Sequence, residues 1–421
     1  MNKWIRASLI GLLAFVMLLG AFSGGFLAGH FFPFGRTIEQ TAVPELPVPP
    51  TVTTEQQSTT PEDLQTLFTP FWEAWTIVHE DYVEQPVDDV LLMQGAIRGM
   101  MEALGDEHSS YMDPQTYADA NAGLAGEYEG IGAWVDTTAE YLTIISPMPG
   151  SPAEKAGLQA GDKIIAIDGE DMTNIDAELA RQRVLGPAGT TVKLTVAREG
   201  EPEPLEFSIV REKIIMKSAS GKMLEGDIAY IQITTFGDKT TPELRAALKE
   251  VMAQNPKGLI LDLRNNGGGY LQTSVEVASE FISKGVILYE QYGNGQRITY
   301  DAQPGGLATD IPLVVLINEG TASASEIVAG AIQDYGRGKL VGVTSYGKGS
   351  VQNWVPLSND QGAVRVTIAK WLTPKERTIH KQGLTPDVEV ELSEADRLAG
   401  KDPQLDKAIQ VLLETIAAGN P

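Results

Sequence analysis

A serine at the start of a predicted helix is the first residue whose surroundings suggest chemistry. In IPLVVLINEGTASASEIVAGAIQDYGRG, a continuous apolar run predicts a buried strand, and Ser323 stands where the following helix begins. A helix N-terminus stabilises the negative charge that develops when a serine attacks a carbonyl group. The same residues also have a purely structural explanation, because Ser323 and Glu326 have the S-x-x-E spacing of a helix capping box. The segment alone leaves both explanations open.

A nucleophilic serine needs a base, and the side chains of this sequence restrict the choice. The 421 residues include no cysteine and four histidines, at positions 30, 79, 108 and 380. Among the histidines only His108, in GDEHSSYMDP, is a serious candidate. A lysine is the alternative if burial lowers its pKa enough for it to accept a proton. Lys348 lies between two glycines in TSYGKGSVQNWVPL, and the apolar strands predicted on both sides would desolvate it.

A glycine-rich turn between a predicted strand and a predicted helix offers backbone donors. In LDLRNNGGG the turn follows a buried strand over Leu259–Leu263 and enters a helix over residues 270–283. Amides at such a helix N-terminus stabilise developing negative charge, although a phosphate could bind there as well. A nucleotide loop is not predicted nearby. Gly342–Lys348 reads G-x-x-x-x-G-K, but Gly349 replaces the required Ser or Thr and a strand follows instead of a helix.

Residues 125–212 alternate short strand-like runs with turns and are suited to binding a peptide. The segment SPAEKAGLQAGDKIIAIDG, residues 151–169, predicts a capped short helix, then a strand and a tight turn. Upstream, the sequence GIGA frees backbone N–H groups that can converge on a carboxylate. Glycines with a purely structural role are the alternative here. The candidate peptide-binding residues are Gly130, Ile131, Gly132 and Ala133.

The elements before this region predict export and a tether. Residues 7–28 carry no charge, and as a helix these 22 residues would span roughly 33 Å, enough to cross a bilayer. Lys3 and Arg6 precede them, which places the N-terminus in the cytoplasm and the body outside. A cleaved signal peptide is the alternative, but the apolar run is long and lacks a clean Ala-x-Ala site. Residues 33–62, rich in Pro and Thr, predict an extended linker.

Helical spacing of apolar residues then predicts helices over residues 64–82 and 90–104, with the aromatic residues of the first forming a helix–helix core. The formal net charge of −24 argues against a nucleic-acid partner, which requires a basic face. The absence of cysteine excludes disulfides, thiolate nucleophiles and Cys-based zinc sites. The scarcity of histidine leaves little material for a metal site, and the chemistry described above requires no metal and no cofactor.

The motifs together resemble one family. GTASASEI, followed 25 residues after Ser323 by Lys348 in YGKGSVQ and preceded by LDLRNNGGG, is similar to the C-terminal processing (tail-specific) serine peptidases. Residues 125–212 resemble a PDZ domain of exported proteases, and the resemblance runs from about residue 64 to 415. It implies an α/β fold with a spiral-like core of the crotonase/ClpP kind, an inserted PDZ domain and an N-terminal helical cap. One transmembrane helix would precede these parts.

The resemblance also implies the roles of individual residues. Ser323 would be the nucleophile, Lys348 the general base, and Gln352 the residue that orients the lysine. The oxyanion hole would be formed by the backbone N–H of Ala324 with that of Gly268 or Gly269. The PDZ domain would bind the apolar C-terminal tail of a protein substrate by adding it as a strand.

The chain departs from the family at two places. Relatives often carry a basic residue at the position of Leu185, so regulation of this chain by its PDZ domain is expected to differ. A Ser-Gly-type turn is usual where this chain has Lys375-Glu376, which leaves the conformation of that loop open.

We therefore expect a single-pass cell-membrane serine endopeptidase with its catalytic body on the extracytoplasmic side. The predicted division is a cytoplasmic stub and anchor (1–32), a linker (33–62), a helical region (63–118), a PDZ domain (119–212) and a protease core (213–421). The sequence allows a homo-oligomer. One rival hypothesis is a non-catalytic adaptor that binds tails on a protease scaffold, and another is a hydrolase that uses His108.

Overall fold

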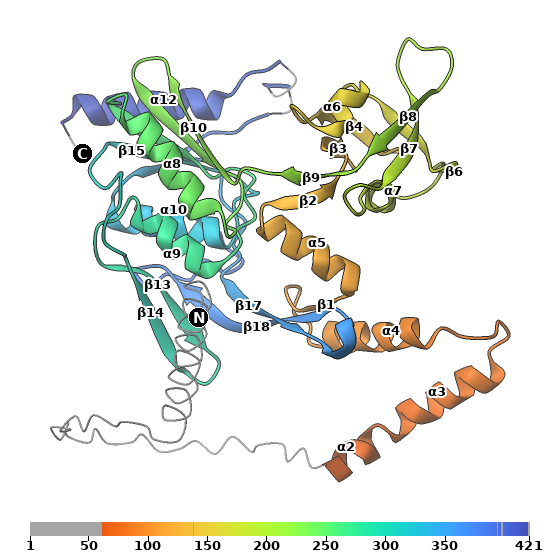
Figure 1. Ribbon diagram of the computed structural model, residues 1–421. Coiled ribbons are helices and arrows are strands. Elements are labelled where there is room, and N and C mark those ends of the chain that lie inside the picture. The colour runs from red at the N-terminus through yellow and green to blue at the C-terminus, as the bar shows by residue number, and fades with distance from the viewer. Residues whose placement is uncertain (1–60, 138, 394, 397–398, 420–421) are drawn as a thin grey trace, which may run out of the picture. The chain divides into compact units, whose positions relative to one another are not determined.

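The computed structural model describes residues 61–419 apart from 138, 394 and 397–398 (Figure 1). The chain divides into two compact units, with the boundary between Val87 and Asp88. The predicted anchor over residues 7–28 and residues 33–60 of the predicted linker (33–62) lie outside the described residues, and the last two residues of that linker begin α2 (Pro61–Leu67). In the described ranges no helix is both long enough and apolar enough to cross a membrane.

In its described residues, 61–87, the first unit contains two helices, α2 (Pro61–Leu67) and α3 (Thr69–Asp81), where the sequence predicts one over residues 64–82. Within the described residues of the first unit, α3 has no buried residue, and the expected helix–helix core stays a prediction. The aromatic side chains of α3 contact one another along the helix, and the rings of Phe71 and Trp75 have centroids 6.2 Å apart. This i, i+4 contact is the spacing at which side chains meet on a helix surface.

The second unit begins with α4 (Asp89–Glu102), β1 (Ser110–Met112) and α5 (Pro114–Leu124). Asp88 starts α4 by accepting hydrogen bonds from two backbone amides, and Asp113 starts α5 by accepting one from Thr116 N at 2.9 Å. The predicted end of α4 near Gly105 is confirmed, since that glycine has a φ of +65°. Short β1 pairs antiparallel with β18 (Ala363–Leu372), which attaches this segment to the core.

The core contains a six-stranded sheet in the order β10-β11-β12-β15-β16-β19. Its first pair is antiparallel and the other four are parallel. The strands are β10 (Ala219–Leu224), β11 (Ile228–Ile233), β12 (Gly258–Asp262), β15 (Leu313–Ile317), β16 (Lys339–Gly342) and β19 (Val388–Glu389). Both central strands, β12 and β15, are buried along their whole length, as their continuous apolar sequences predict.

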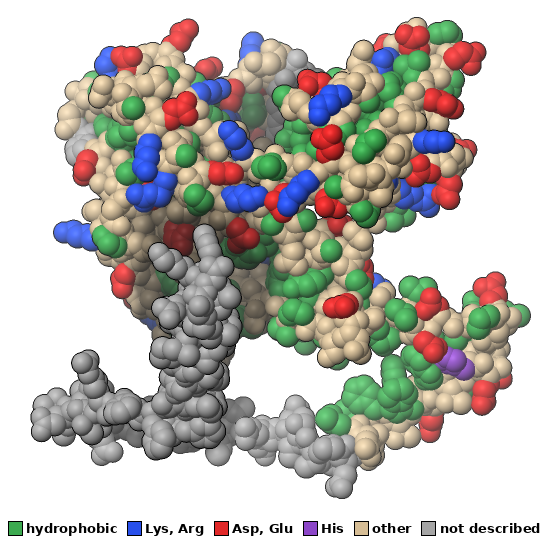
Figure 2. All heavy atoms as spheres, in the orientation of Figure 1, with side chains coloured by type: hydrophobic (Ala, Val, Ile, Leu, Met, Phe, Trp, Pro, Cys, Tyr) green, Lys and Arg blue, Asp and Glu red, His purple; other side chains and the backbone are tan. Residues whose placement is uncertain are grey.

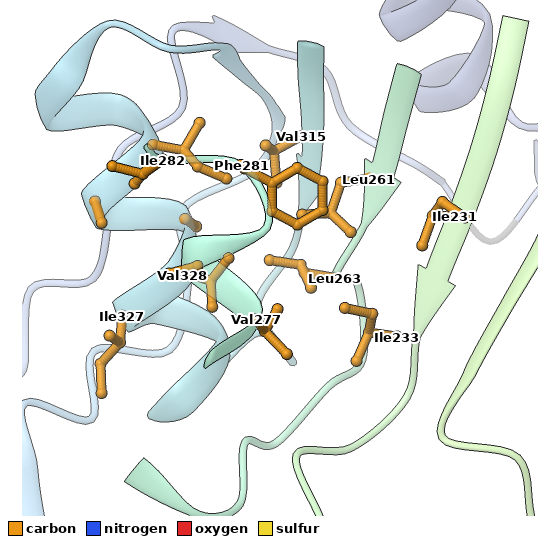
Figure 3. Packing of buried hydrophobic residues seen from close by; sticks show 14 of the residues in the cluster. Ile231, Ile233, Leu261, Leu263, Val277, Phe281, Ile282, Val315, Ile327 and Val328 are labelled. Atoms are coloured by element: carbon orange, nitrogen blue, oxygen red, sulfur yellow. The ribbon is translucent and has the colours of Figure 1, made fainter. Parts of the chain in front are cut away.

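Helices cover both faces of this sheet. Figure 3 shows Leu261, Leu263 and Val315 of the sheet packing with Val277 and Val328 of two helices. Alternate residues of the same strands point the other way and pack against the C-terminal helix. The helices on the first face are α8 (Thr240–Met252), α9 (Leu271–Ser279) and α10 (Ala324–Tyr335), and the C-terminal helix is α12 (Pro403–Ala417). The predicted α/β class is thus confirmed.

A second, antiparallel sheet combines strands from both sides of α10 in the sequence. It has the order β1-β18-β13-β14, with β17 also paired to β18. The strands new to this sheet are β13 (Val286–Tyr292), β14 (Arg297–Asp301) and β17 (Ser350–Pro356), and a short 3-10 turn, η1 (Ser358–Asp360), precedes β18. In the loop after β18, Glu376 takes a φ of +59°, the conformation that a glycine in a Ser-Gly turn would favour.

Residues 133–210 form a separate antiparallel sheet with its own apolar core. The strand order is β3-β4-β5-β7-β8, with β6 beside β5, so β3 is an edge strand. The ladder β2–β9 joins this domain to the core. The elements are β2 (Glu127–Gly130), β3 (Ala133–Asp136), β4 (Thr143–Pro147), α6 (Pro152–Ala156), β5 (Lys163–Ile167), β6 (Glu170–Asp171), α7 (Ala177–Val184), β7 (Thr191–Ala197), β8 (Leu205–Val210) and β9 (Glu212–Ile215). The predicted cap is confirmed, since Ser151 Oγ accepts from Glu154 N at 3.2 Å.

Charges on the second unit are mixed in sign. On the face shown in Figure 2, Lys and Arg side chains lie among Asp and Glu side chains. One largely buried cation is Arg264, two residues after the end of β12, whose side chain is 11% exposed. It binds Asp262, which is 1% exposed, at 2.7 Å and Asp402 at 2.9 Å, and so joins the sheet to the start of α12.

We predict that Arg264→Leu destabilises the protein by about 3–5 kcal/mol, because it leaves the buried carboxylate of Asp262 without its cation. The free energy of unfolding in urea measures this loss. Lys257→Ala is the matched control. The side chains of Lys257 and Asp227 are 60% and 64% exposed, so loss of their ion pair should lower the free energy of unfolding by less than about 1 kcal/mol. Equal effects of the two substitutions would contradict a buried-charge role for Arg264.

Candidate active site

Ser323 is positioned by the turn between β15 and α10. It has a φ of +56° and a ψ of −116°, a conformation that costs a non-glycine residue of order 1–3 kcal/mol. The turn is fixed to the neighbouring turn after β12. Thr321 donates to Leu263 O at 2.9 Å, and the side chain of Asn318 donates to Asn265 Oδ1 at 2.7 Å. Surrounding hydrogen bonds therefore hold the serine in a strained backbone conformation.

Glu326 connects the serine to the loop that carries Lys348. Its carboxylate is fully buried and accepts hydrogen bonds from four donors. One oxygen accepts from the amides of Ser323 (2.8 Å) and Lys348 (2.9 Å), and the other accepts from Gly347 N (2.7 Å) and Ser345 Oγ (2.6 Å). Burial raises the pKa of Glu326, and these donors oppose that rise. The S-x-x-E pattern is thus more than a helix cap, because its carboxylate also holds a second loop.

Lys348 is half-buried between two glycines. A Cβ at Gly347 would lie 2.8 Å from Gly383 N, and one at Gly349 would lie 2.8 Å from His380 Cβ, so the loop has no room for side chains at either position. Burial lowers the pKa of Lys348, and the positive charge of Arg365 lowers it further. The negative charges of Glu326 and Asp106 oppose this shift. The resulting pKa lies below that of an ordinary lysine, so the neutral amine is easier to reach.

The glycine-rich turn lies directly against the serine. A Cβ at Gly268 would be 2.8 Å from Ser323 Cβ and 2.9 Å from Ala324 N, and Gly268 has a φ of +100°. The Gly268 amide donates to Asn266 Oδ1 at 2.9 Å, so its hydrogen is already used. Among the described residues, no backbone acceptor pairs with the amides of Gly269 or Ala324. Of the two glycines predicted for an oxyanion hole, Gly269 therefore has the available donor.

One cleft of about 580 Å³ contains every residue predicted for the reaction. Its lining includes Ser323, Ala324, Lys348, Gln352, Gly268 and Gly269. The side-chain nitrogen of Gln352 donates to Ser350 Oγ (2.9 Å) and Thr367 Oγ1 (3.1 Å), which leaves its oxygen to accept from another group. Within the described residues, no group of three or more His, Asp or Glu side chains is placed to bind a metal ion.

Sequence reasoning missed several residues of this cleft. Arg365 and Trp371 of β18 line it, and so do Tyr117, Asn121 and Leu124 of α5. The α5 residues lie about 200 positions before Ser323, and no local pattern relates the two segments. The pairing of β1 with β18 and the contact of Tyr117 with Trp354, whose ring centroids are 6.3 Å apart, bring the start of α5 to the core.

His108 is not part of the cleft lining. It is 8% exposed, and its ring centroid lies 6.3 Å from that of His380. Burial lowers the pKa of His108, and the nearby charge of Lys348 lowers it further. Of the remaining histidines, His79 is on α3, where its ring stacks on Trp75, and His30 lies outside the described residues.

A second hollow, of about 600 Å³, lies at the edge strand β3. Of the four predicted peptide-binding residues, Ile131 and Ala133 line it. Gly130 and Gly132 alternate with them, and a Cβ at Gly132 would lie 2.5 Å from Ser151 Cβ. The rest of the lining is largely apolar, with Leu142, Ile164, Val184 and Leu185 from the same domain and Gln115, Ala118, Asp119 and Ala122 from α5.

Comparisons with known proteins agree with this architecture. The family model described as peptidase family S41 matches residues 227–390, and a PDZ domain model matches 143–198. A model described as the activating protease CtpB N-terminal domain matches 29–116. A solved Bacteroides fragilis structure assigned to the S41 proteases is 17% identical with a TM-score of 0.51, covering 82% of this chain and 96% of that one. This last likeness concerns the fold alone.

Two curated relatives are more similar in sequence. The carboxy-terminal-processing protease of Bartonella bacilliformis is 40% identical over 344 residues, which cover 80% of this chain and 78% of the relative. The carboxy-terminal processing protease CtpA of Bacillus subtilis is 37% identical over 335 residues, covering 79% and 70%. With identity at this level over most of both chains, the protein belongs to the S41 carboxy-terminal processing proteases, which are serine peptidases, and it carries the PDZ domain of that family.

Proposed function

We propose that this protein is a membrane-tethered endopeptidase that recognises substrate tails in its PDZ groove and cleaves with Ser323 as nucleophile and Lys348 as base. One observation carries the proposal. Ser323, Lys348, Gln352 and the predicted oxyanion-hole residues all line a single cleft, and the lysine among them has a lowered pKa. A lysine that must accept a proton has to spend time neutral, and burial provides that condition.

The proposed reaction uses only groups of this chain. Neutral Lys348 accepts the proton of Ser323 Oγ as that oxygen attacks the substrate carbonyl carbon. The carbonyl oxygen becomes negative and accepts hydrogen bonds from the amides of Ala324 and Gly269. The ammonium of Lys348 then donates its proton to the leaving amine, and the peptide bond breaks to give an acyl-enzyme. Water releases the acyl group, with Lys348 again acting as base and Gln352 holding the amine in place.

Tail recognition is proposed for the hollow at β3. An edge strand presents unpaired N–H and C=O groups to which an extended peptide can add. The apolar side chains that line the hollow suit an apolar final residue, and the amides of residues 130–133 suit its carboxylate. Substrates would therefore be proteins with apolar C-terminal tails.

The tether is proposed from the sequence. Residues 7–28 would anchor the chain in the cell membrane, and residues 33–62 would hold the body on the extracytoplasmic side. Three further expectations stay predictions. They are the domain boundaries at 62/63, 118/119 and 212/213, the spiral-like resemblance of the core to the crotonase/ClpP group, and assembly into a homo-oligomer.

The proposed roles predict that Ser323→Ala and Lys348→Ala each lower kcat/KM by at least about 10³-fold, since each removes a group that acts in the rate-determining chemistry. Cleavage of a soluble protein with an apolar tail measures this. His108→Ala should remain active within about tenfold. Normal cleavage by Lys348→Ala together with loss in His108→Ala would favour the His108 hydrolase. If wild type and Ser323→Ala bound tails but were equally inert, the adaptor would be the better hypothesis.

The charges around Lys348 predict that removing a nearby cation and removing a nearby anion shift the pH dependence of activity in opposite directions. Activity should rise as pH passes the lowered pKa of Lys348, below the 10.5 of an ordinary lysine, because the neutral amine is the active form. Arg365→Gln removes a nearby cation, so the pKa rises and the acid limb of kcat/KM moves to higher pH. Asp106→Asn removes an anion that is ionised above a pKa of about 2, so the limb moves to lower pH. Shifts of both variants in one direction would contradict Lys348 as the base.

The Glu326 network predicts that Glu326→Gln lowers kcat by about 10- to 1,000-fold. The amide keeps one acceptor oxygen but places an NH2 group against two donors, each costing about 1–3 kcal/mol when unsatisfied. The acid limb should also move to lower pH, because the anion that raises the pKa of Lys348 is gone. Steady-state kinetics measure both effects, with Glu250→Gln, an exposed carboxylate on α8, as control. A variant that loses thermal stability but keeps wild-type kcat would refute the positioning role.

A further inference from the structure

The cleft of Ser323 is lined by positive charge, although the chain as a whole is acidic. The formal net charge is −24, yet among the described residues the charged side chains of the lining are Lys348 and Arg365, with no Asp or Glu. Lys348 has to be neutral when it acts as the proposed base. Arg365 keeps its charge throughout, because a guanidinium does not lose its proton in a protein. A cleft with such a fixed cation attracts negative groups of a substrate.

The guanidinium of Arg365 has no partner in the part of the chain that the structure describes. Its Nε is shielded from solvent and lacks a hydrogen-bond partner, and no carboxylate there forms an ion pair with it. The two anions that act on neighbouring Lys348 are engaged elsewhere. Glu326 accepts its four hydrogen bonds, and Asp106 accepts from Ser109 Oγ at 2.5 Å. The donors of Arg365 are therefore available to a group that the substrate brings.

The strand register places Arg365 beside Gln352. In the ladder of β17 with β18, Gln352 pairs with Thr367 and Trp354 pairs with Arg365, with no bulge between these two pairs. Paired residues, and residues two apart on one strand, point to the same face, so Arg365 and Gln352 share the face that lines the cleft. Two strand residues rise roughly 7 Å, which an extended substrate also covers in two residues. Because Gln352 is proposed to hold the base, Arg365 lies within about three substrate residues of the scissile bond.

We propose that Arg365 is a specificity residue, which binds an acidic side chain of the substrate within about three residues of the scissile bond. The planar guanidinium offers parallel N–H donors that match the two oxygens of a carboxylate. This inference rests on the proposed function, because it places the substrate in the cleft of Ser323. It adds a second point of recognition, so that a preferred substrate has both an apolar tail and an acidic residue near the bond that is cut.

The test compares two peptides that share one apolar C-terminal tail and carry Asp or Asn near the cleavage site. The substituted position is found by scanning the three positions on each side of the bond. We expect wild type to cleave the Asp peptide with a kcat/KM about 10- to 100-fold higher, since hydrogen bonds between charged groups are the strong ones. Arg365→Gln should bring this ratio to about one, and Arg365→Glu should make the Asp peptide the poorer substrate. A changed pKa of Lys348 in the free enzyme acts on both peptides equally and cancels in the ratio.

Lys370→Gln is the matched control. Lys370 is an exposed cation of the same strand and does not line the cleft, so its loss should leave the ratio unchanged. Equal loss of the preference in this variant would overturn the proposal, because overall charge would then select the substrate. Amidated peptides distinguish the acidic side chain from the chain terminus as the source of the carboxylate. If amidation, and not the change of Asp to Asn, lowers cleavage in a way that Arg365→Gln abolishes, the assignment to a side chain is wrong.

The outcomes separate this inference from the proposed function. If wild type cleaves both peptides equally and Ser323→Ala cleaves neither, the role of Arg365 is wrong and the proposed function stands. If wild type cleaves neither, the proposed function fails, and binding to Ser323→Ala, measured by fluorescence anisotropy, decides the role of Arg365. A lower Kd for the Asp peptide that is lost when Arg365→Gln is added supports the role, and equal Kd values overturn it. Thermal unfolding checks that the variants are folded, and Arg365→Lys, which keeps the charge, should retain a reduced preference.

Discussion

The parallel pairing of β12 with β15 is the constraint on which the site depends. Leu259 pairs with Leu313 and Asp262 with Leu316, so the two strands end at the same edge of the sheet. The turns that follow them carry Gly268 and Ser323, and these residues consequently lie in contact although they are 55 positions apart. An antiparallel pair would have placed the two turns at opposite ends of the strands. The glycine-rich turn and Ser323, the proposed nucleophile, are therefore brought together by strand direction before any side chain is considered.

The structure adds Lys348 to this edge through a single buried carboxylate. Glu326 is in the first turn of α10 and accepts from both the serine backbone and the lysine loop. Four donors on one carboxylate fix both loops with little freedom, which is how a site achieves the positioning that catalysis requires. The same negative charge opposes the lowering of the lysine pKa. Glu326 thus positions the loop of Lys348 but favours the charged form of that lysine, whereas its proposed role as a base requires the neutral amine.

The sequence was sufficient for residues whose roles depend on local backbone. Ser323 at a helix start, Lys348 between glycines and the cap at Ser151 each follow from a few neighbouring residues, and the structure places them as predicted. It was insufficient where tertiary contacts decide. Three features depend on segments that meet only in the fold. They are the hydrogen bonds from the Lys348 loop to Glu326, the effect of Arg365 on the pKa of Lys348, and the position of α5 beside the cleft. The aromatic spacing of α3 does not decide its own outcome, because the i, i+4 spacing that suits a buried core also lets aromatic residues contact one another along a single helix.

Helix α5 gives a physical reason why the hollow at β3 and the cleft of Ser323 can be coupled, because residues of this helix line both. At 3.6 residues per turn, Gln115, Ala118, Asp119 and Ala122 lie on one face, and these residues line the hollow at β3. Tyr117, Asn121 and Leu124 lie on the opposite face and line the cleft of Ser323. A rigid helix cannot move one face without the other, so a tail that pressed on α5 would also alter the far wall of the cleft. The backbone carbonyl of Leu124 accepts from Asp238 N at 3.1 Å, which fixes the C-terminal end of α5 to the core.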